Sequence, residues 1–278
     1  MAMTLSERNA FFKAGIAFCA VSTLLILAAS FIIVPVYQTM GENSYRPAGF
    51  FQVFISRFLE VDYIAVHSSV VMAVLFSIIG IILIYSFFEH TTAPEILYIA
   101  FFTVSLSFEA IRLILPLRLI YDIPSFYILI ALRVLLFARY FGIFSLFAAS
   151  IYAAGLEVQK SRNTIMIIFI AALAIIFSVP INTQIWDTSL NMINGYISMF
   201  RLIEAVVFIT TVISFFIAVK VRGSKYYSYI GVGVMLALIG RNLLLGADNW
   251  VCPVLGILLL SIGTWFVCSK LHKIHLWL

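Results

Sequence analysis

Long, uninterrupted runs of apolar residues dominate the chain. Runs of about 20 residues or more are too long for strands, and they lack the ten-residue segments of alternating apolar and polar character that mark a transmembrane barrel. A helix of about 20 residues, rising 1.5 Å per residue, crosses the roughly 30 Å of hydrocarbon in a bilayer. The pattern therefore predicts an all-α fold, a polytopic integral membrane helix bundle.

Eight runs meet the length requirement, and turn-forming segments separate them. The predicted transmembrane helices are residues 11–37, 63–88, 94–115, 125–155, 164–180, 195–219, 226–245 and 251–267. The longest connection, residues 38–62, is too short for a separate domain, so residues 1–278 are predicted to form a single bundle. Within that connection Phe51, Phe54 and Phe58 share a helical face, which fits either an interfacial helix or an early start of the second span.

Two pairs of spans resemble each other at a separation of four spans. The first and fifth spans end in Val-Pro, at Pro35 and Pro180, and the third and seventh carry an arginine before apolar residues, Arg112 and Arg241. These matches predict a 4+4 tandem repeat with both halves in one orientation, unlike inverted transporter repeats. Chance similarity between apolar segments is the alternative.

Small residues on two spans predict close helix packing. They are Ala149, Ala153, Gly256 and Gly263.

The composition agrees with a membrane protein, because 64% of the residues are hydrophobic and 10% are charged. A soluble domain has roughly 25% charged residues, so a water-soluble globule is excluded. Cytoplasmic loops collect Lys and Arg, and an inside amino terminus gives nine such residues inside against three outside. The inner set is Arg8, Lys13, Lys160, Arg162, Lys220, Arg222, Lys225, Lys270 and Lys273, and the outer set is Arg46, Arg57 and Arg118.

This distribution predicts an integral protein of a bacterial inner (plasma) membrane with both termini in the cytoplasm. The net charge of +5 then follows from topology and gives no reason to expect nucleic acid as a partner.

Ionisable residues also occur within the predicted spans. They are Glu109, Arg112, Arg133, Arg139, Arg201, Glu204 and Arg241. A charge at mid-bilayer costs at least about 2.5 kcal/mol, so such groups normally face the bundle interior and find partners. The direction of each span places six of them in the outer half, and Arg139 lies deeper by about 9 Å.

Two interpretations of these charges remain open. They are either structural ion pairs and snorkelling arginines, or the lining of an outward-facing site. Two carboxylates cannot neutralise four outer arginines, and guanidinium groups suit carboxylate or phosphate, so the site would take an anionic small molecule or a lipid headgroup. The predicted ligand-binding residues are Arg112, Arg133, Arg201, Arg241, Glu109, Glu204, His67 and Asn242. All but His67 and Asn242 are expected to converge on one cavity that opens outward.

The sequence contains no motif that indicates a particular chemical reaction. No lysine lies deep in a span, as retinal attachment would require, and His90, His272 and His275 lie at the inner edge, where they could not ligate mid-depth haem or zinc. No nucleophile elbow, paired-glutamate motif or P-loop occurs. We therefore expect no cofactor, no metal ion and no catalytic residue, although Glu109 as an intramembrane base stays open.

The leading hypothesis is a non-enzymatic, receptor-like or sensory membrane module that binds an anionic ligand from outside. Its layout is similar, in architecture alone, to the membrane-embedded sensory modules of bacterial signalling proteins. Its expected partners are membrane lipids, an anionic small molecule and a separate cytoplasmic signalling protein. The alternatives are a small secondary transporter for an anionic or lipid-like substrate, which would need charges in both membrane halves, and a structural assembly subunit.

Overall fold

The computed structural model describes residues 4–41, 58–91, 93–156 and 161–276. Its elements are α1 (Leu5–Gly41), α3 (Tyr63–Phe88), α4 (Pro94–Ser105), the 3-10 helix η1 (Leu106–Leu113), α5 (Ile114–Tyr121), α6 (Ser125–Ala153), α7 (Ser161–Ser178), β1 (Ile181–Trp186), β2 (Met192–Asn194), α8 (Ile197–Arg222), α9 (Tyr226–Leu245) and α10 (Val251–Leu276). Within these described ranges, eight helical segments are long and apolar enough to cross a membrane, which confirms the predicted number.

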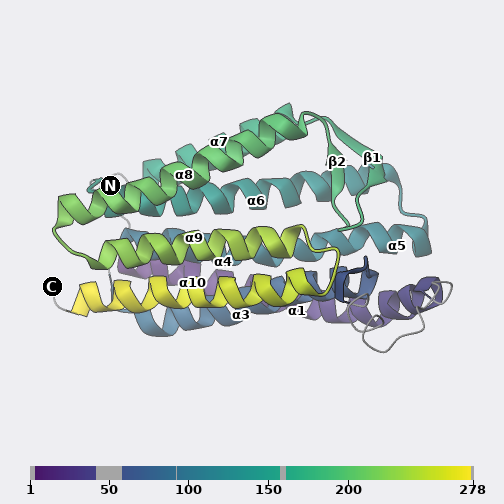
Figure 1. Ribbon diagram of the computed structural model, residues 1–278, viewed down its shortest axis with the longest axis horizontal. Helices are drawn as coiled ribbons and strands as arrows, with labels where there is room; N and C mark the ends of the chain where they lie inside the picture. Colours follow the sequence, from purple (N-terminus) through teal and green to yellow (C-terminus); the bar gives the residue numbers. More distant parts are fainter. Residues whose placement is uncertain (1–3, 42–57, 92, 157–160, 277–278) are drawn as a thin grey trace.

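The long helices lie side by side along the longest axis of the molecule (Figure 1). Both ends of the chain lie at one end of the bundle, here called the terminal end, and β1 and β2 lie at the opposite end, here called the hairpin end (Figure 1). Three residues of the charge count, Arg46, Arg57 and Lys160, lie outside the described residues, as do Phe51 and Phe54 of the predicted aromatic face.

The third predicted span is α4, η1 and α5 in series, with a 3-10 helix in the middle. In a 3-10 helix residues three apart are eclipsed, because there are three residues per turn. Glu109 and Arg112 lie on this segment, and each is only 1% exposed. The tighter winding therefore puts two buried charges on the same line along η1.

Glycines bring α9 and α10 into backbone contact. A Cβ added to Gly240 would lie 2.6 Å from the carbonyl oxygen of Gly256, and one added to Gly263 would lie 2.5 Å from the carbonyl oxygen of Gly233. Small residues allow this approach in apolar surroundings, where backbone packing replaces the hydrophobic driving force between helices. The close packing predicted for Gly256 and Gly263 is confirmed.

Two arginines hold helix ends at the terminal end. Arg8 on α1 donates from Nη2 to the carbonyl oxygens of Phe88 (2.9 Å) and Glu89 (2.8 Å) at the end of α3. Arg222 donates from Nε to the carbonyl oxygen of Ala153 (3.3 Å) at the end of α6. A cation at a helix carboxyl terminus satisfies carbonyls that lack a helical partner and complements the helix dipole.

The connection after α7 forms a short antiparallel hairpin, which the sequence pattern did not predict. The Asp187 amide donates to the carbonyl oxygen of Asn191 (2.7 Å), which closes the turn. The tip turns into the bundle (Figure 1), where Leu190, 4% exposed, belongs to an apolar cluster with Leu115 on α5 and Ile128 on α6. The hairpin thus fills the hairpin end of the bundle.

The 4+4 repeat stays a prediction. In a 4+4 repeat the fourth span corresponds to the eighth, and the second to the sixth. The contact between α6 and α8 therefore has a counterpart in the contact between α10 and α3, as a repeat would require. However, the first and fifth spans, which should correspond, pack on spans that do not correspond. The fifth, α7, packs on the fourth, α6, whereas the first, α1, packs on the second, α3. Arg112 also lies in a 3-10 helix, whereas Arg241 lies in an α-helix.

Candidate functional site

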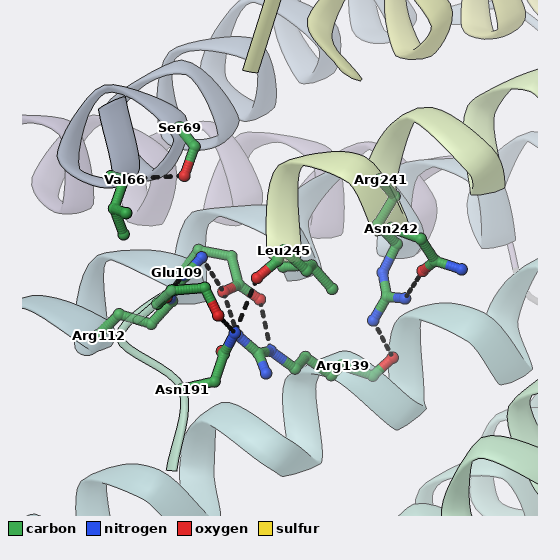
Figure 2. A network of polar contacts seen from close by, with 10 residues as sticks. Val66, Ser69, Glu109, Arg112, Arg139, Asn191, Arg241, Asn242 and Leu245 are labelled. Carbon is green, nitrogen blue, oxygen red and sulfur yellow. Dashed lines mark hydrogen bonds and ion pairs between the residues drawn. The ribbon is translucent and has the colours of Figure 1, made fainter. Parts of the chain in front are cut away.

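A buried carboxylate between two arginines forms the centre of the polar cluster at the hairpin end. Arg139 on α6 donates from Nε to Oε1 of Glu109 (2.8 Å) and from Nη2 to Oε2 (2.6 Å), as Figure 2 shows. Nη1 of Arg112 lies 3.8 Å from Oε2 of the same carboxylate. Paired guanidinium–carboxylate bonds of this kind are short and directional, and burial protects them from water. One negative charge therefore faces two positive ones.

The tip of the hairpin completes this cluster. Nη2 of Arg139 also donates to Oδ1 of Asn191 (2.8 Å), and Arg112 donates to the carbonyl oxygen of Ser189. The side-chain amide nitrogen of Asn191, Nδ2, donates to the carbonyl oxygen of Leu245 at the end of α9 (2.7 Å). We call Glu109, Arg112, Arg139 and Asn191 the Glu109 cluster. It ties the hairpin to η1, α6 and α9 through hydrogen bonds.

Arg241 on α9 lies beside the Glu109 cluster and is 2% exposed. It donates from Nη1 to Oδ1 of Asn242 (3.0 Å) and from Nη2 to the carbonyl oxygen of Arg139 (3.4 Å), as Figure 2 shows. Within the described ranges it forms no ion pair with a carboxylate. The guanidinium is thus buried among neutral acceptors, although the charges of Glu204 and Glu109 act on it from a distance.

A cavity of about 350 Å³ lies between α6, α8 and α9, and Arg241 is part of its wall. We call it the Arg241 pocket. Its polar lining is Arg201, Glu204, Arg241 and Asn242, and its apolar lining is Ile143, Ala205, Phe208, Leu238 and Ile239. Two arginines and one glutamate give the pocket a surplus of one positive charge. Its volume falls in the range of small-molecule sites, and apolar walls with a few polar groups are typical of them.

The structure brings most of the predicted site residues to the hairpin end, but into two neighbouring sites where one cavity was expected. Glu109 and Arg112 belong to the Glu109 cluster, and Arg201, Glu204, Arg241 and Asn242 line the Arg241 pocket. The contact between Arg241 and the Arg139 carbonyl joins the two. Arg201 and Glu204 lie three residues apart on α8, but they form no ion pair in the part of the chain described here, and Arg201 is exposed.

Two predicted residues lie elsewhere. The guanidinium of Arg133 lies over the ring of Phe177 on α7, 5.7 Å from its centroid, and does not line the Arg241 pocket. Six residues along α6 rotate by 600°, so Arg133 and Arg139 point about 120° apart. Nε2 of His67 lies 2.8 Å from Oγ of Ser30, which joins α3 to α1, and His67 is not part of the pocket wall.

Sequence reasoning missed two functional groups on the hairpin, Asn191 and Ser189. Both lie in a connection whose Asp, Thr, Ser and Asn residues are typical of an exposed turn. Nothing in that pattern indicates that the turn folds into the bundle. Arg139 was predicted to lie about 9 Å deeper than the other charges of the predicted spans, so its ion pair with Glu109 was not expected from the sequence.

Comparisons of the chain with protein-family models, with curated proteins and with solved structures find no match. Among the described residues, no group of three or more His, Cys, Asp or Glu side chains is placed to hold a metal ion.

Proposed function

We propose that the chain is a non-enzymatic, receptor-like or sensory module of a cell membrane, and that it binds an anionic ligand in the Arg241 pocket. The observation that carries the proposal is the state of Arg241. Its guanidinium is buried, its hydrogen bonds go to neutral acceptors, and it faces a cavity with one surplus positive charge. A buried charge is costly without a counter-charge, so an anion in this cavity would be stabilised.

The contacts of Arg241 also give binding a route to the rest of the bundle. A ligand that draws the guanidinium into the pocket competes with its hydrogen bond to the Arg139 carbonyl. Arg139 in turn holds Glu109 and the hairpin residue Asn191. Binding would therefore bias the position of the hairpin, a local change in packing of the kind that switches a two-state element. A cytoplasmic partner would then read the state of the helices at the terminal end.

Transport is the second candidate, and the terminal half of the bundle argues against it. The rings of Tyr98 and Tyr152 stack there with centroids 5.3 Å apart, inside the large apolar cluster that includes Phe102. Within the described ranges, the ion pairs lie only in the Glu109 cluster. A translocation path would need polar groups through both halves. Uptake of a ligand into proteoliposomes that contain the protein would favour transport over a receptor-like function.

Ligand binding should depend on Arg241. We expect an anion from a screen of phosphate, glycerol phosphate, succinate and fatty acids to raise the melting temperature of the purified protein. Arg241→Gln should weaken that ligand at least about tenfold, because a hydrogen bond to a charged group contributes about 1.5–3 kcal/mol. Isothermal titration and ligand-dependent thermal shift measure the effect.

Arg133→Gln is the matched control, because Arg133 is also an intramembrane arginine but packs on Phe177 outside the pocket. It should leave the affinity unchanged. The proposal fails if no anion stabilises the protein, or if both substitutions weaken binding equally.

The orientation is tested by single cysteines in a cysteine-free background. Asp187, an exposed residue directly after β1, and Ser224, between α8 and α9, lie at opposite ends of the bundle. We expect an impermeant maleimide to label Asp187→Cys in intact cells and Ser224→Cys only after permeabilisation, because Lys and Arg concentrate in loops at the terminal end. The reverse labelling would contradict the orientation, and equal labelling would contradict spanning.

A further inference from the structure

The Arg241 pocket has a polar end and an apolar end. α8 runs away from the hairpin end, so its pocket residues Arg201 and Glu204 lie nearer that end than Phe208 does. α9 runs the opposite way, so Arg241 lies nearer the hairpin end than Leu238 does. The separation of seven residues between Arg201 and Phe208 corresponds to about 10 Å along the helix. Charge and apolar surface are therefore separated along the length of the cavity.

The pocket opens on the flank of the bundle, between α8 and α9. Three of its lining residues, Arg201, Ala205 and Asn242, are exposed. Beside this opening, α8 presents the apolar side chains of Leu202 (64% exposed) and Val206 (51%) to the surroundings. Apolar surface of this kind on a helix long enough to span a bilayer is suited to contact with lipid tails. A ligand could thus enter sideways from the membrane as well as from water.

The charge count limits the head of such a ligand. Arg201 and Arg241 carry two positive charges and Glu204 one negative charge, so one further negative charge makes the pocket neutral. Arg241, at 2% exposure, is the donor that a head group would meet at the polar end. Asn242 on the same wall offers an amide beside it.

From this separation of charge and apolar surface, the lateral opening and the charge count, we propose that the Arg241 pocket binds a single-chain amphiphile with one negative charge, such as a fatty acid. Its carboxylate would meet Arg241 and Asn242, and its chain would lie between Ala205, Phe208 and Leu238. This inference rests on the proposed function and narrows its ligand class, because a purely hydrophilic anion would leave the apolar end of the cavity empty.

The test compares ligands that share a head or a chain. The probes are acetate, butanoate, hexanoate, octanoate and neutral octan-1-ol, titrated into the whole purified protein in a lipid nanodisc. Each buried methylene should strengthen binding up to about fourfold until the cavity is full. Octanoate should therefore bind at least about tenfold more tightly than acetate, and octan-1-ol should bind at least about tenfold more weakly than octanoate.

Two variants separate the head from the chain. Arg241→Gln should reduce octanoate binding at least about tenfold and bring it close to that of octan-1-ol. Ala205→Phe adds a ring to the wall between Glu204 and Phe208, where it would block the path of the chain, and should abolish the dependence on chain length. Val206→Phe is its matched control, because Val206 is the adjacent exposed residue and does not line the pocket. If Arg241→Gln fails to fold, the pair at positions 205 and 206 still decides the inference.

Four results would overturn the inference. Equal affinity for acetate and octanoate, lost in Arg241→Gln, would leave the proposed anion site standing and refute the amphiphile. Equal affinity for octanoate and octan-1-ol would show that the pocket does not recognise the carboxylate. Equal effects of Ala205→Phe and Val206→Phe would show that the chain binds elsewhere. Absence of binding by every anion, including phosphate and succinate, would overturn the inference and the proposed function together.

Discussion

Glu109→Gln is expected to destabilise the protein by about 3–5 kcal/mol, the cost of removing one partner from a buried ion pair. The carboxylate is 1% exposed and holds both oxygens against Arg139. Its neutral replacement leaves the guanidinium groups of Arg139 and Arg112 buried without a counter-charge. It also loosens Asn191, because Arg139 would no longer be fixed against the hairpin. Denaturation in mixed detergent micelles, followed by circular dichroism, measures the change.

Glu204→Gln is the matched control for this prediction. Glu204 is a half-buried glutamate that makes no ion pair within the described residues, so its loss should cost about 1 kcal/mol or less. The double variant Glu109→Gln with Arg139→Gln should be less destabilised than the sum of its parts, because it removes both charges of the pair. Equal effects of Glu109→Gln and Glu204→Gln would contradict the central role of Glu109.

The second large effect is expected at the α9–α10 contact. Gly240→Ala places a Cβ 2.5 Å from the backbone nitrogen of Leu260 and 2.6 Å from the carbonyl oxygen of Gly256. Both atoms belong to the backbone, so no side chain can rotate away and the two helices must separate. The cost should reach about 3 kcal/mol, the upper part of the range for overpacking. The same unfolding measurement in micelles gives the value.

Gly246→Ala provides the comparison, since its added Cβ would meet only the carbonyl oxygen of Asn242 at 3.5 Å. That is an ordinary contact, and the substitution should stay within about 0.5 kcal/mol of the parent protein. A small effect at Gly240, similar to that at Gly246, would show that α9 and α10 do not need the close approach.

Helix rotation explains why the candidate site could be predicted only in part. Counting residues along a span gives the depth of a charge, and this placed Arg112, Arg201 and Arg241 correctly at one end of the bundle. It does not give the direction in which each side chain points. Arg133 lies six residues, about 9 Å, from Arg139 along α6 and packs on Phe177, because its face of the helix is turned towards α7. Arg139 points to Glu109 from the other side.

The sequence by itself determined the number of long apolar helices and their approximate positions, because the length of an apolar run is a property of the chain alone. It did not determine their limits, since α1 begins six residues before the predicted first span and α10 ends nine residues after the predicted eighth. It also located the small residues Gly256 and Gly263, since close helix packing needs the absence of a side chain. Only the tertiary structure decided that Asn191 and Ser189 enter the bundle and close the Glu109 cluster. The path of a connection depends on the space that packed helices leave, and no local pattern of residues records that space.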